Sequence, residues 1–370
     1  MSINIEKAVL IAGGYGVVGS QVARLFRQRH PDIPLLLGGR NPESASTLID
    51  EIGNAKAIEL DVTVDKPLAT LDSNPIVILN VVNDSDNNLL IGSINRSIAY
   101  VDVTRWTDKM REAILCTSTR DLQAPVLLSS GWMAGVTAII TAVASQKFAI
   151  INNIDIDILY GIGDKSGPNS IEYIDRMAIP FEIVVEGEKQ QRYPFSDPKT
   201  VKFPSGYKGR VYRFDTPDQM TLPSSLNAKS VSTRIGYDSA LVTGSLAFLI
   251  KSGVMKLLDR PIFNGIRRGL LYSSGEGASH EIIIEIVGTN SSGNPKVSVV
   301  SIVDPKGQTH LTALGAVIQL ERVLALNDQQ ALTTDVHFPE QSVQFSAALS
   351  LLSDNGVKIN GLEANDDSPI

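Results

Sequence analysis

Residues 7–19, which read KAVLIAGGYGVVG, decide the fold of the N-terminal half of this chain. A continuous apolar run over residues 8–12 leads directly into glycines at positions 14, 16 and 19, the G-x-G-x-x-G spacing. An amphipathic helix pattern follows at Val22, Leu25 and Phe26. A strand, a glycine-rich turn and a helix in this order are the context in which the spacing indicates dinucleotide binding.

Each glycine of the turn has a physical reason. Gly14 permits a tight turn off the strand, Gly16 lets a pyrophosphate approach the backbone, and Gly19 lets the helix pack closely on the strand. The phosphates would lie on free N–H groups at the helix N-terminus, where the helix dipole favours negative charge. The alternative is an ordinary glycine-rich turn that binds nothing. The nucleotide interpretation makes cofactor contacts of Gly14, Tyr15, Gly16, Val17, Val18 and Gly19.

The end of the second apolar run indicates which nucleotide is bound. Residues 34–41 read PLLLGGRN, and Arg40 stands where an NAD-selective site usually places Asp or Glu, about 20 positions after the last glycine. A guanidinium offers a planar charged fork to a 2′-phosphate. We therefore expect NADP, with NAD less favoured, and we expect Arg40 and Asn41 to contact it. The alternative is that Arg40 only solvates the strand end.

Composition restricts the remaining classes of function. The chain has 370 residues, 43% of them hydrophobic, which is enough for two domains with substantial cores. The net charge of −7 provides no basic footprint for nucleic acid or for anionic membranes. A single cysteine, Cys116, excludes an internal disulfide and suits a reducing compartment. The longest later apolar run, residues 240–250, is too short to span a bilayer. We expect a soluble cytoplasmic protein.

Strand and helix patterns alternate up to about residue 131. Near-continuous apolar strands separated by helices predict a parallel sheet covered on both faces. The expected strands are 8–12, 34–39, 57–62, 76–82, 100–103 and 126–129. The expected helices are 42–52, a short one at 65–71, 87–97, 108–117 and 136–148.

The second half has a different pattern. Strand-like pieces at 154–160, 181–186 and 210–214 lie among Pro, Gly and Ser, and residues 281–287 and 297–303 flank a turn-rich segment typical of a hairpin. A helix is expected near 238–258, and helical periodicity returns at 314–326 and 342–352. The fold class is thus α/β, an N-terminal Rossmann-type parallel sheet with a second α+β domain on a mostly antiparallel sheet. We expect a dinucleotide-binding domain over 1–135, completed by C-terminal helices at about 312–360, and a substrate and dimerisation domain over 136–311.

Several segments together resemble the saccharopine dehydrogenase-like oxidoreductases, a family that includes glutamate-forming saccharopine reductases and carboxynorspermidine dehydrogenases. One departure matters, because Ala134 stands where the family often has proline in a Gly-aromatic-x-Pro-Gly turn. The similar segments are 13–19 with 39–41, Leu60-Asp61-Val62, 100–104 (YVDVT), 131–137 (GWMAGVT), Thr312-Ala313, 338–341 (FPEQ) and 355–357 (NGV).

The resemblance implies hydride transfer between NADPH and an imine or carbonyl carbon of a small substrate, in a homodimer, with the adenine near Asp61 and Val62. An open α/β sheet binds ligands at the carboxyl ends of its strands. Asn80 and Val81 close one expected strand and are candidates for the ribose and nicotinamide side. Asp102 closes the next strand and is a candidate catalytic residue that stabilises an iminium or orients a water. A helix cap or a structural hydrogen bond is the alternative role for Asp102.

Further substrate contacts are expected around these strand ends. Thr104 is a candidate for a catalytic hydrogen bond to the substrate. Arg105 could bind a substrate carboxylate beside an apolar wall formed by Trp106, although a surface turn is the alternative. Tyr173 and Arg176 of the second domain are candidates for the same cleft, against a plain exposed helix. His30, His280, His310 and His337 lack metal-ligand spacing, so we expect no metal site and assign them no role.

Two other functions are considered for a chain that begins with a glycine-rich turn of this kind. A short-chain-type reductase typically needs a tyrosine followed four positions later by lysine, which lowers the tyrosine pKa. No tyrosine of this chain is followed by lysine four positions later; for example, Thr104 follows Tyr100 at that spacing, and Val211 follows Tyr207. The second rival is a non-catalytic NADP-binding sensor, which stays open because a fold does not by itself imply catalysis.

Overall fold

A computed structural model describes residues 3–103, 105–165, 173, 175–255, 275–327, 329–341 and 344–362. Internal contacts divide the chain into two compact units. The first comprises Met1–Val136 and Thr312–Pro339, and the second comprises Thr137–Leu311 and Glu340–Ile370. The sequence predicts that residues 312–360 complete the first domain. The contacts instead place 312–339 in the first unit and the residues from 340 onward in the second. Each unit is described by itself.

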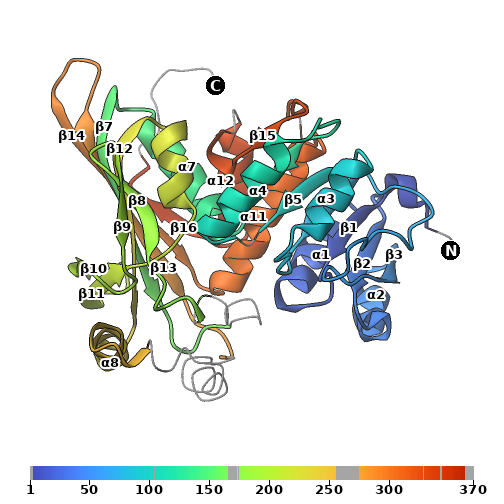
Figure 1. Ribbon diagram of the computed structural model, residues 1–370, viewed down its shortest axis with the longest axis horizontal. Helices are drawn as coiled ribbons and strands as arrows, with labels where there is room; N and C mark the ends of the chain where they lie inside the picture. Colours follow the sequence, from blue (N-terminus) through green and yellow to red (C-terminus); the bar gives the residue numbers. More distant parts are fainter. Residues whose placement is uncertain are drawn as a thin grey trace. The chain divides into compact units, whose positions relative to one another are not determined.

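The first unit is built on a parallel seven-stranded sheet in the order β15-β6-β5-β4-β1-β2-β3 (Figure 1). The central strands are buried apolar runs, with Leu10, Ile11, Leu36 and Leu79 fully enclosed, as expected for a sheet covered on both faces. Its strands are β1 (Val9–Ala12), β2 (Leu35–Gly39), β3 (Ala55–Glu59), β4 (Val77–Asn80), β5 (Ala99–Asp102), β6 (Val126–Leu127) and β15 (Val336–His337). The strand order reverses between β1 and β4, which is the doubly wound topology predicted from the sequence.

Helices connect these strands. They are α1 (Val17–Arg29), α2 (Ser46–Ile52) after the 3-10 turn η2 (Pro42–Ala45), α3 (Asn88–Asn95), α4 (Thr107–Ser118) and α11 (Gln308–Val323). Glu321 of α11 binds α1 through Arg29 Nε at 2.5 Å and His30 Nε2 at 2.8 Å. The prediction of a short helix at 65–71 is wrong. That segment forms successive turns closed by bonds such as Ala69 N to Lys66 O, because so short a segment containing Pro67 gains too few helical bonds to nucleate a helix.

The second unit contains a seven-stranded mixed sheet in the order β10-β11-β12-β7-β13-β14-β16. Only β12 and β7 run parallel among these neighbours, and the others pair antiparallel. The strands are β10 (Lys199–Lys202), β11 (Lys208–Arg213), β12 (Ala228–Tyr237), β7 (Ile150–Tyr160), β13 (His280–Thr289), β14 (Pro295–Asp304) and β16 (Lys358–Asn360). A separate hairpin joins β8 (Phe181–Val185) and β9 (Glu188–Arg192). The hairpin expected from residues 281–303 is confirmed as β13 and β14.

One face of this sheet forms the core of the second unit. Ile156 pairs with Ile284 and Ile158 with Ile282, so alternating isoleucines align on the same face and are fully buried. The helices α5 (Thr137–Ser145) and α7 (Asp218–Ser225) pack against β13 and β12 respectively. Helix α8 (Ala240–Lys251) packs against β11 and β12, and α12 (Phe345–Asp354) packs against β16. Among the helices of the described residues, none is both long and apolar enough to cross a membrane.

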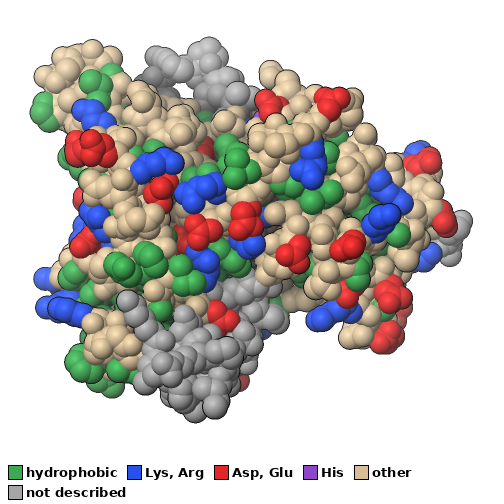
Figure 2. All heavy atoms as spheres, in the orientation of Figure 1, with side chains coloured by type: hydrophobic (Ala, Val, Ile, Leu, Met, Phe, Trp, Pro, Cys, Tyr) green, Lys and Arg blue, Asp and Glu red, His purple; other side chains and the backbone are tan. Residues whose placement is uncertain are grey.

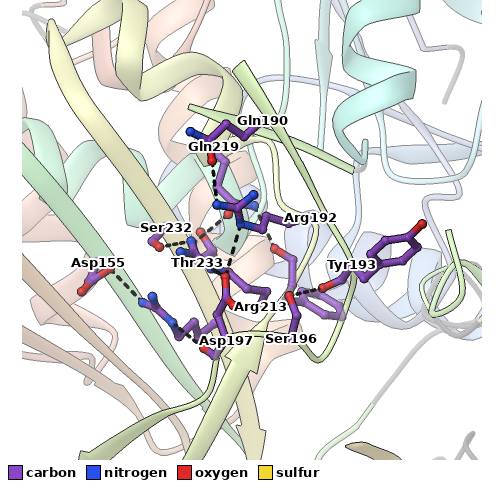
Figure 3. A network of polar contacts seen from close by, with 12 residues as sticks. Asp155, Gln190, Arg192, Tyr193, Ser196, Asp197, Arg213, Gln219, Ser232 and Thr233 are labelled. Carbon is purple, nitrogen blue, oxygen red and sulfur yellow. Dashed lines mark hydrogen bonds and ion pairs between the residues drawn. The ribbon is translucent and has the colours of Figure 1, made fainter. Parts of the chain in front are cut away.

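The opposite face carries a buried network of charges, part of which is drawn in Figure 3. Lys199 Nζ lies 2.9 Å from carboxylate oxygens of both Asp155 and Asp157, and Arg234 donates to Asp155 at 2.8 Å. These cations hold the pKa of Asp155 below its usual value, while burial raises that of Asp157. Positive and negative groups compensate one another, so the network joins β7, β10 and β12 as a structural element.

The network continues into the loop before β10. Asp197 receives the guanidinium groups of Arg192 and Arg213 at 3.3 and 3.4 Å, and Arg213 also binds the Ser232 hydroxyl (Figure 3). The side-chain oxygen Oε1 of Gln219, on α7, accepts a hydrogen bond from the Thr233 amide at 3.0 Å. Polar contacts therefore hold α7 and the loop at 193–198 on the sheet.

Candidate functional site

The glycine-rich turn is as tightly built as its spacing predicted. A side chain at Gly14 would place its Cβ 2.9 Å from Leu37 Cα and from the Ile11 carbonyl oxygen. A Cβ at Gly19 would lie only 2.1 Å from the Gly13 carbonyl oxygen, so α1 could not approach the turn. Gly13 itself has φ +82° and packs on Val82 at the end of β4. These contacts explain why the turn requires glycine on grounds of packing alone.

Gly16 differs from the other glycines of the turn. Apart from its chain neighbours and the backbone of α1, a Cβ there would meet only the Gly13 carbonyl oxygen among the described residues, at 3.2 Å. Gly16 is also the N-cap of α1 and provides no side chain to cap the first N–H groups of the helix. Open space beside a helix N-terminus with no acidic residue in its first turn is suited to an anion. The residues present therefore fit a dinucleotide pyrophosphate.

Tyr15 connects the turn to the end of β2. Its hydroxyl accepts a hydrogen bond from the Asn41 amide at 3.0 Å. A Cβ at Gly39 would collide with the same hydroxyl at 2.1 Å, so Gly39 leaves the space that Tyr15 occupies. Tyr15 thus fixes the backbone on which Arg40 is carried. The sequence placed both residues at the cofactor but did not indicate that they are joined in this way.

Arg40 is exposed at the carboxyl end of β2. Within the described part of the chain, its guanidinium forms neither a hydrogen bond nor an ion pair with a protein group. The Asp61 carboxylate beyond β3 accepts two bonds from Thr63, at 2.9 and 2.7 Å, which together with the charge of Arg40 lower its pKa. Val62 follows Asp61 and is half-buried. Arg40 is therefore available to a ligand anion, whereas Asp61 is occupied by its own turn.

The carboxyl end of β4 lies beside the turn. Asn80 is buried, its side-chain Nδ2 donates to the Tyr100 hydroxyl at 3.1 Å, and its side-chain Oδ1 accepts from Val82 N at 3.2 Å. The Val81 amide donates to Ala12 O at 3.1 Å, and a Cβ at Gly13 would lie 3.1 Å from the Val81 side chain. Asn80 and Val81 thus form one wall next to the glycine-rich turn, at the strand-order reversal where doubly wound sheets bind nucleotides.

Asp102 and Arg105 form a buried ion pair at the carboxyl end of β5. Arg105 Nε lies 2.5 Å from Asp102 Oδ2, and their side chains are 3% and 1% exposed. Asp102 Oδ1 accepts the Ser129 amide at 2.7 Å, and Arg105 also donates to Asn87 at 2.7 Å. Burial raises the pKa of Asp102, and the neighbouring guanidinium opposes that rise. In this geometry Asp102 and Arg105 bind one another and fix the ends of β5 and β6.

The segment after β6 contains unusual backbone. Ser129 has φ +64° and Ala134 has φ +52°, although neither is glycine. Ser130 donates its amide to Asp102 O at 2.7 Å, and its hydroxyl is buried with no hydrogen-bond partner among the described residues. Strained backbone of this kind persists only where the surroundings enforce it, and it is frequent at ligand sites. Ser129 and Ser130 gave no recognisable signal in the sequence.

The remaining expected site residues lie in different surroundings. Thr104 lies outside the described residues. Trp106 is half-buried and begins α4 as its N-cap. In the second unit, the Tyr173 ring stacks on Phe214 with centroids 5.6 Å apart, and Arg176 lies 3.3 Å from the Asp215 carboxylate. The structure thus gathers the residues expected to bind the cofactor, with Asp102, Arg105 and Trp106, within the first unit. It pairs Tyr173 and Arg176 with neighbouring residues of the second unit.

Two histidines have carboxylate partners that sequence reasoning missed. His310 Nδ1 lies 2.7 Å from Asp304, and His30 binds Glu321. His280 is fully buried against Tyr160, and burial lowers its pKa to about 3. Among the described residues, no group of three or more His, Cys, Asp or Glu side chains is placed to hold a metal ion.

A solved structure has a similar fold. The chain is similar to apo saccharopine dehydrogenase (L-Glu forming) from Saccharomyces cerevisiae, with a TM-score of 0.61 over 95% of this chain and 99% of that chain, at 14% identity. Weaker likenesses include a myo-inositol dehydrogenase from Corynebacterium glutamicum (TM-score 0.43, 12% identity, 94% and 95% covered). GenD2 from gentamicin A biosynthesis, solved in complex with NAD, is as distant (TM-score 0.43, 11% identity, 96% and 95% covered). No protein-family model and no curated protein matches the chain.

The likeness to the yeast enzyme extends over both units, and at 14% identity it concerns the fold. The chain therefore shares the fold of that enzyme, in which a Rossmann-type sheet is combined with a second, mixed sheet. The motif-based resemblance to saccharopine dehydrogenase-like proteins has a structural counterpart, but this likeness does not assign the chain to that family.

Proposed function

We propose that this protein is an NADP-dependent oxidoreductase of the saccharopine dehydrogenase-like type. Its substrate would be a small amino-acid-like or polyamine-like molecule with an imine or carbonyl carbon. The observation that carries the proposal is the open space beside Gly16 at the start of α1, together with the exposed Arg40 at the end of the next strand. The fold likeness to a dehydrogenase supports the same class of reaction.

The residues of the first unit would divide the work of cofactor binding. The backbone of the turn at Gly14 and Gly16 and the N-terminus of α1 would hold the pyrophosphate. Arg40 would bind a 2′-phosphate, and Asn80 and Val81 would border the nicotinamide side. When bound, NADPH supplies a hydride to the substrate carbon. The Asp102–Arg105 pair is then a positioning element that holds the ends of β5 and β6 in place.

Substrate contacts remain proposals for Thr104, Trp106, Tyr173 and Arg176. Trp106 would supply an apolar surface, and Arg176 a cation suited to a carboxylate. We further propose that the protein works as a cytoplasmic homodimer. The single Cys116 suits a reducing compartment. Analytical ultracentrifugation of the full chain tests the oligomeric state directly.

Calorimetric titration with NADPH and NADH tests the cofactor proposal. Charge-assisted contacts of this kind contribute about 1.5–3 kcal/mol, so Arg40→Asp should weaken NADPH binding roughly ten- to a hundredfold. Arg40→Lys, which keeps the charge without the planar fork, should lose less. Lys56→Asp on the exposed strand β3 makes the same charge change away from the turn and should bind NADPH normally. Preference of the wild type for NADH would refute the assignment of Arg40.

Catalysis needs a separate experiment. NADPH oxidation should be followed with a panel of keto acids, each offered with and without amino acids and polyamines. Turnover that requires both a keto acid and an amine would indicate imine reduction. A protein that binds NADPH tightly but oxidises it with no member of the panel would instead fit the sensor interpretation.

A further inference from the structure

Helix α8 of the second unit exposes an unusual amount of apolar surface. Its sequence, ALVTGSLAFLIK, contains no charged residue before Lys251. Only Thr243 and Leu246 are buried, whereas Leu241 is 79% exposed, Phe248 70% and Val242 40%. A helix that is apolar on nearly every side is normally enclosed by other protein, and contiguous exposed apolar surface usually marks an interaction site. We refer to Leu241, Val242 and Phe248 as the α8 patch.

Contacts among the described residues hold α8 in place without covering this patch. Ser239 caps the helix by accepting the Val242 amide at 3.3 Å, and the Thr243 hydroxyl accepts the Tyr237 amide of β12 at 2.9 Å. The two buried side chains face the sheet. Leu241 and Phe248 are separated by seven residues, or two helical turns, and therefore lie on the same side of α8. The helix is thus anchored along one side and carries its large apolar side chains outward.

Basic side chains adjoin the α8 patch. Helix α8 packs against β11, which pairs with β10. This hairpin places the exposed residues Lys202, Lys208 and Arg210 on one face, because Lys202 pairs with Lys208 and Arg210 follows Lys208 by two positions. Figure 2 shows apolar side chains gathered where Figure 1 places α8, with Lys and Arg groups over the neighbouring hairpin. Lys251 adds a cation at the end of the helix. An acidic residue, Asp238, lies just before the helix, and its carboxylate accepts a hydrogen bond from the Ile162 amide.

We propose that the α8 patch and its basic surroundings form a docking site for an anionic membrane surface. Exposed large apolar side chains on a short helix, with lysine and arginine beside them, are the chemistry of interfacial helices that enter the headgroup region without crossing the bilayer. Each basic side chain near an anionic surface contributes about fivefold to binding. The negative net charge of the whole chain does not exclude this, because charges more than about 10 Å from the surface are screened by salt.

A second copy of the chain is the less suitable occupant. Stable protein interfaces bury about 800 Å² on each partner and involve about 20 or more residues a side, far more than the α8 patch offers. A two-fold symmetric contact through this helix would also place the same lysines and arginines of both copies close to one another. The proposal does not depend on the oxidoreductase activity.

Vesicle sedimentation with the full-length protein tests this directly. The probes are vesicles of phosphatidylcholine alone and vesicles with about one third phosphatidylglycerol, at low and at high salt. We expect binding to the anionic vesicles that weakens at high salt, and little binding to phosphatidylcholine. Absence of binding to anionic vesicles at low salt would overturn the proposal.

Two pairs of variants separate the apolar and the electrostatic contributions. Leu241→Glu with Phe248→Glu should abolish binding, whereas Leu115→Glu with Val64→Glu, at two residues of the first unit that are 60% and 48% exposed, adds the same charge and should leave it unchanged. Lys202→Glu with Lys208→Glu should lower affinity about 25-fold or more. Lys56→Glu with Lys229→Glu, at two exposed lysines outside this region, makes the same change in net charge and should have little effect.

Two results would contradict the role of the patch. The first is equal loss in the matched controls, which would show that binding follows net charge alone. The second is a wild type that dimerises in ultracentrifugation, fails to bind vesicles and becomes monomeric with Leu241→Glu and Phe248→Glu. That result would identify the patch as an interface between copies. Circular dichroism of every variant confirms that the fold is retained.

Discussion

Removing one partner of the Asp102–Arg105 ion pair should destabilise the first unit strongly. Arg105→Met retains much of the side-chain volume but deletes the guanidinium that lies 2.5 Å from Asp102. The Asp102 carboxylate would then remain buried, with the Ser129 amide at 2.7 Å as its contact with β6. An unpaired charge in such a position is among the most costly changes in a protein core.

The expected magnitude follows from the burial of both groups. Because the two side chains are at most 3% exposed, solvent screens neither charge, and loss of one partner should cost about 3–5 kcal/mol of unfolding free energy. Asp102→Asn should cost a comparable amount, since it removes the carboxylate that lies 2.5 Å from the buried guanidinium. The double variant removes both charges and should cost less than the sum of the single changes, with a coupling of about 2 kcal/mol or more.

Urea unfolding followed by tryptophan fluorescence is the appropriate assay. The chain has two tryptophans, Trp106 and Trp132, and both belong to the first unit, so the signal reports on that unit. The same samples should be titrated with NADPH. A positioning role predicts that any folded variant changes substrate turnover more than cofactor affinity.

Two results would refute this reasoning. If Arg105→Met cost less than about 1 kcal/mol, the pair would behave like an exposed salt bridge and could not fix the strand ends. If the single effects were additive, Asp102 and Arg105 would act independently. Asp102 would then be free for a direct role in catalysis, as the sequence suggested.

Two further predictions concern the turn and acid stability. Gly16→Val should abolish NADPH binding in calorimetry with little loss of stability. Gly19→Val should instead unfold the first unit, because its Cβ would lie 2.1 Å from Gly13 O. Equal stabilities of the two variants would contradict this prediction. Burial lowers the pKa of His280 from 6.5 to about 3 in the folded protein. As the pH falls below 6.5, His280 therefore takes up a proton in the unfolded state but not in the folded state, and the free energy of unfolding decreases. His280→Phe should remove about 2 kcal/mol of the loss between pH 7 and pH 5 in urea titrations, and an unchanged pH dependence would refute it.

Sequence reasoning predicted much of the first unit because its signals are local. The apolar run, the glycine spacing and the helix pattern of residues 7–29 lie within about thirty positions, and each element follows from its own residues. The structure confirms the parallel sheet and the combination with a second, mixed sheet. Element ends were less well placed. The strand expected at 57–62 ends at Glu59, because Asp61 forms a turn with Thr63.

The candidate site could be located from the sequence, but not the partners of its residues. The order of strands placed Asn80, Asp102 and Arg105 at the carboxyl ends of the sheet. The bond from Ser129 to Asp102 joins residues 27 positions apart, and that from Arg234 to Asp155 joins residues 79 apart. Neither is encoded in a local pattern.

By itself, then, the sequence determined that a glycine-rich turn opens a doubly wound sheet, because glycine spacing and apolar periodicity act within a few residues. Only the tertiary structure decided that Arg105 binds Asp102, and that the Arg40 guanidinium forms no hydrogen bond or ion pair among the described residues. It also decided that the apolar helix α8 remains exposed rather than buried. The physical reason is that burial and charge pairing depend on segments that meet only after the chain has folded.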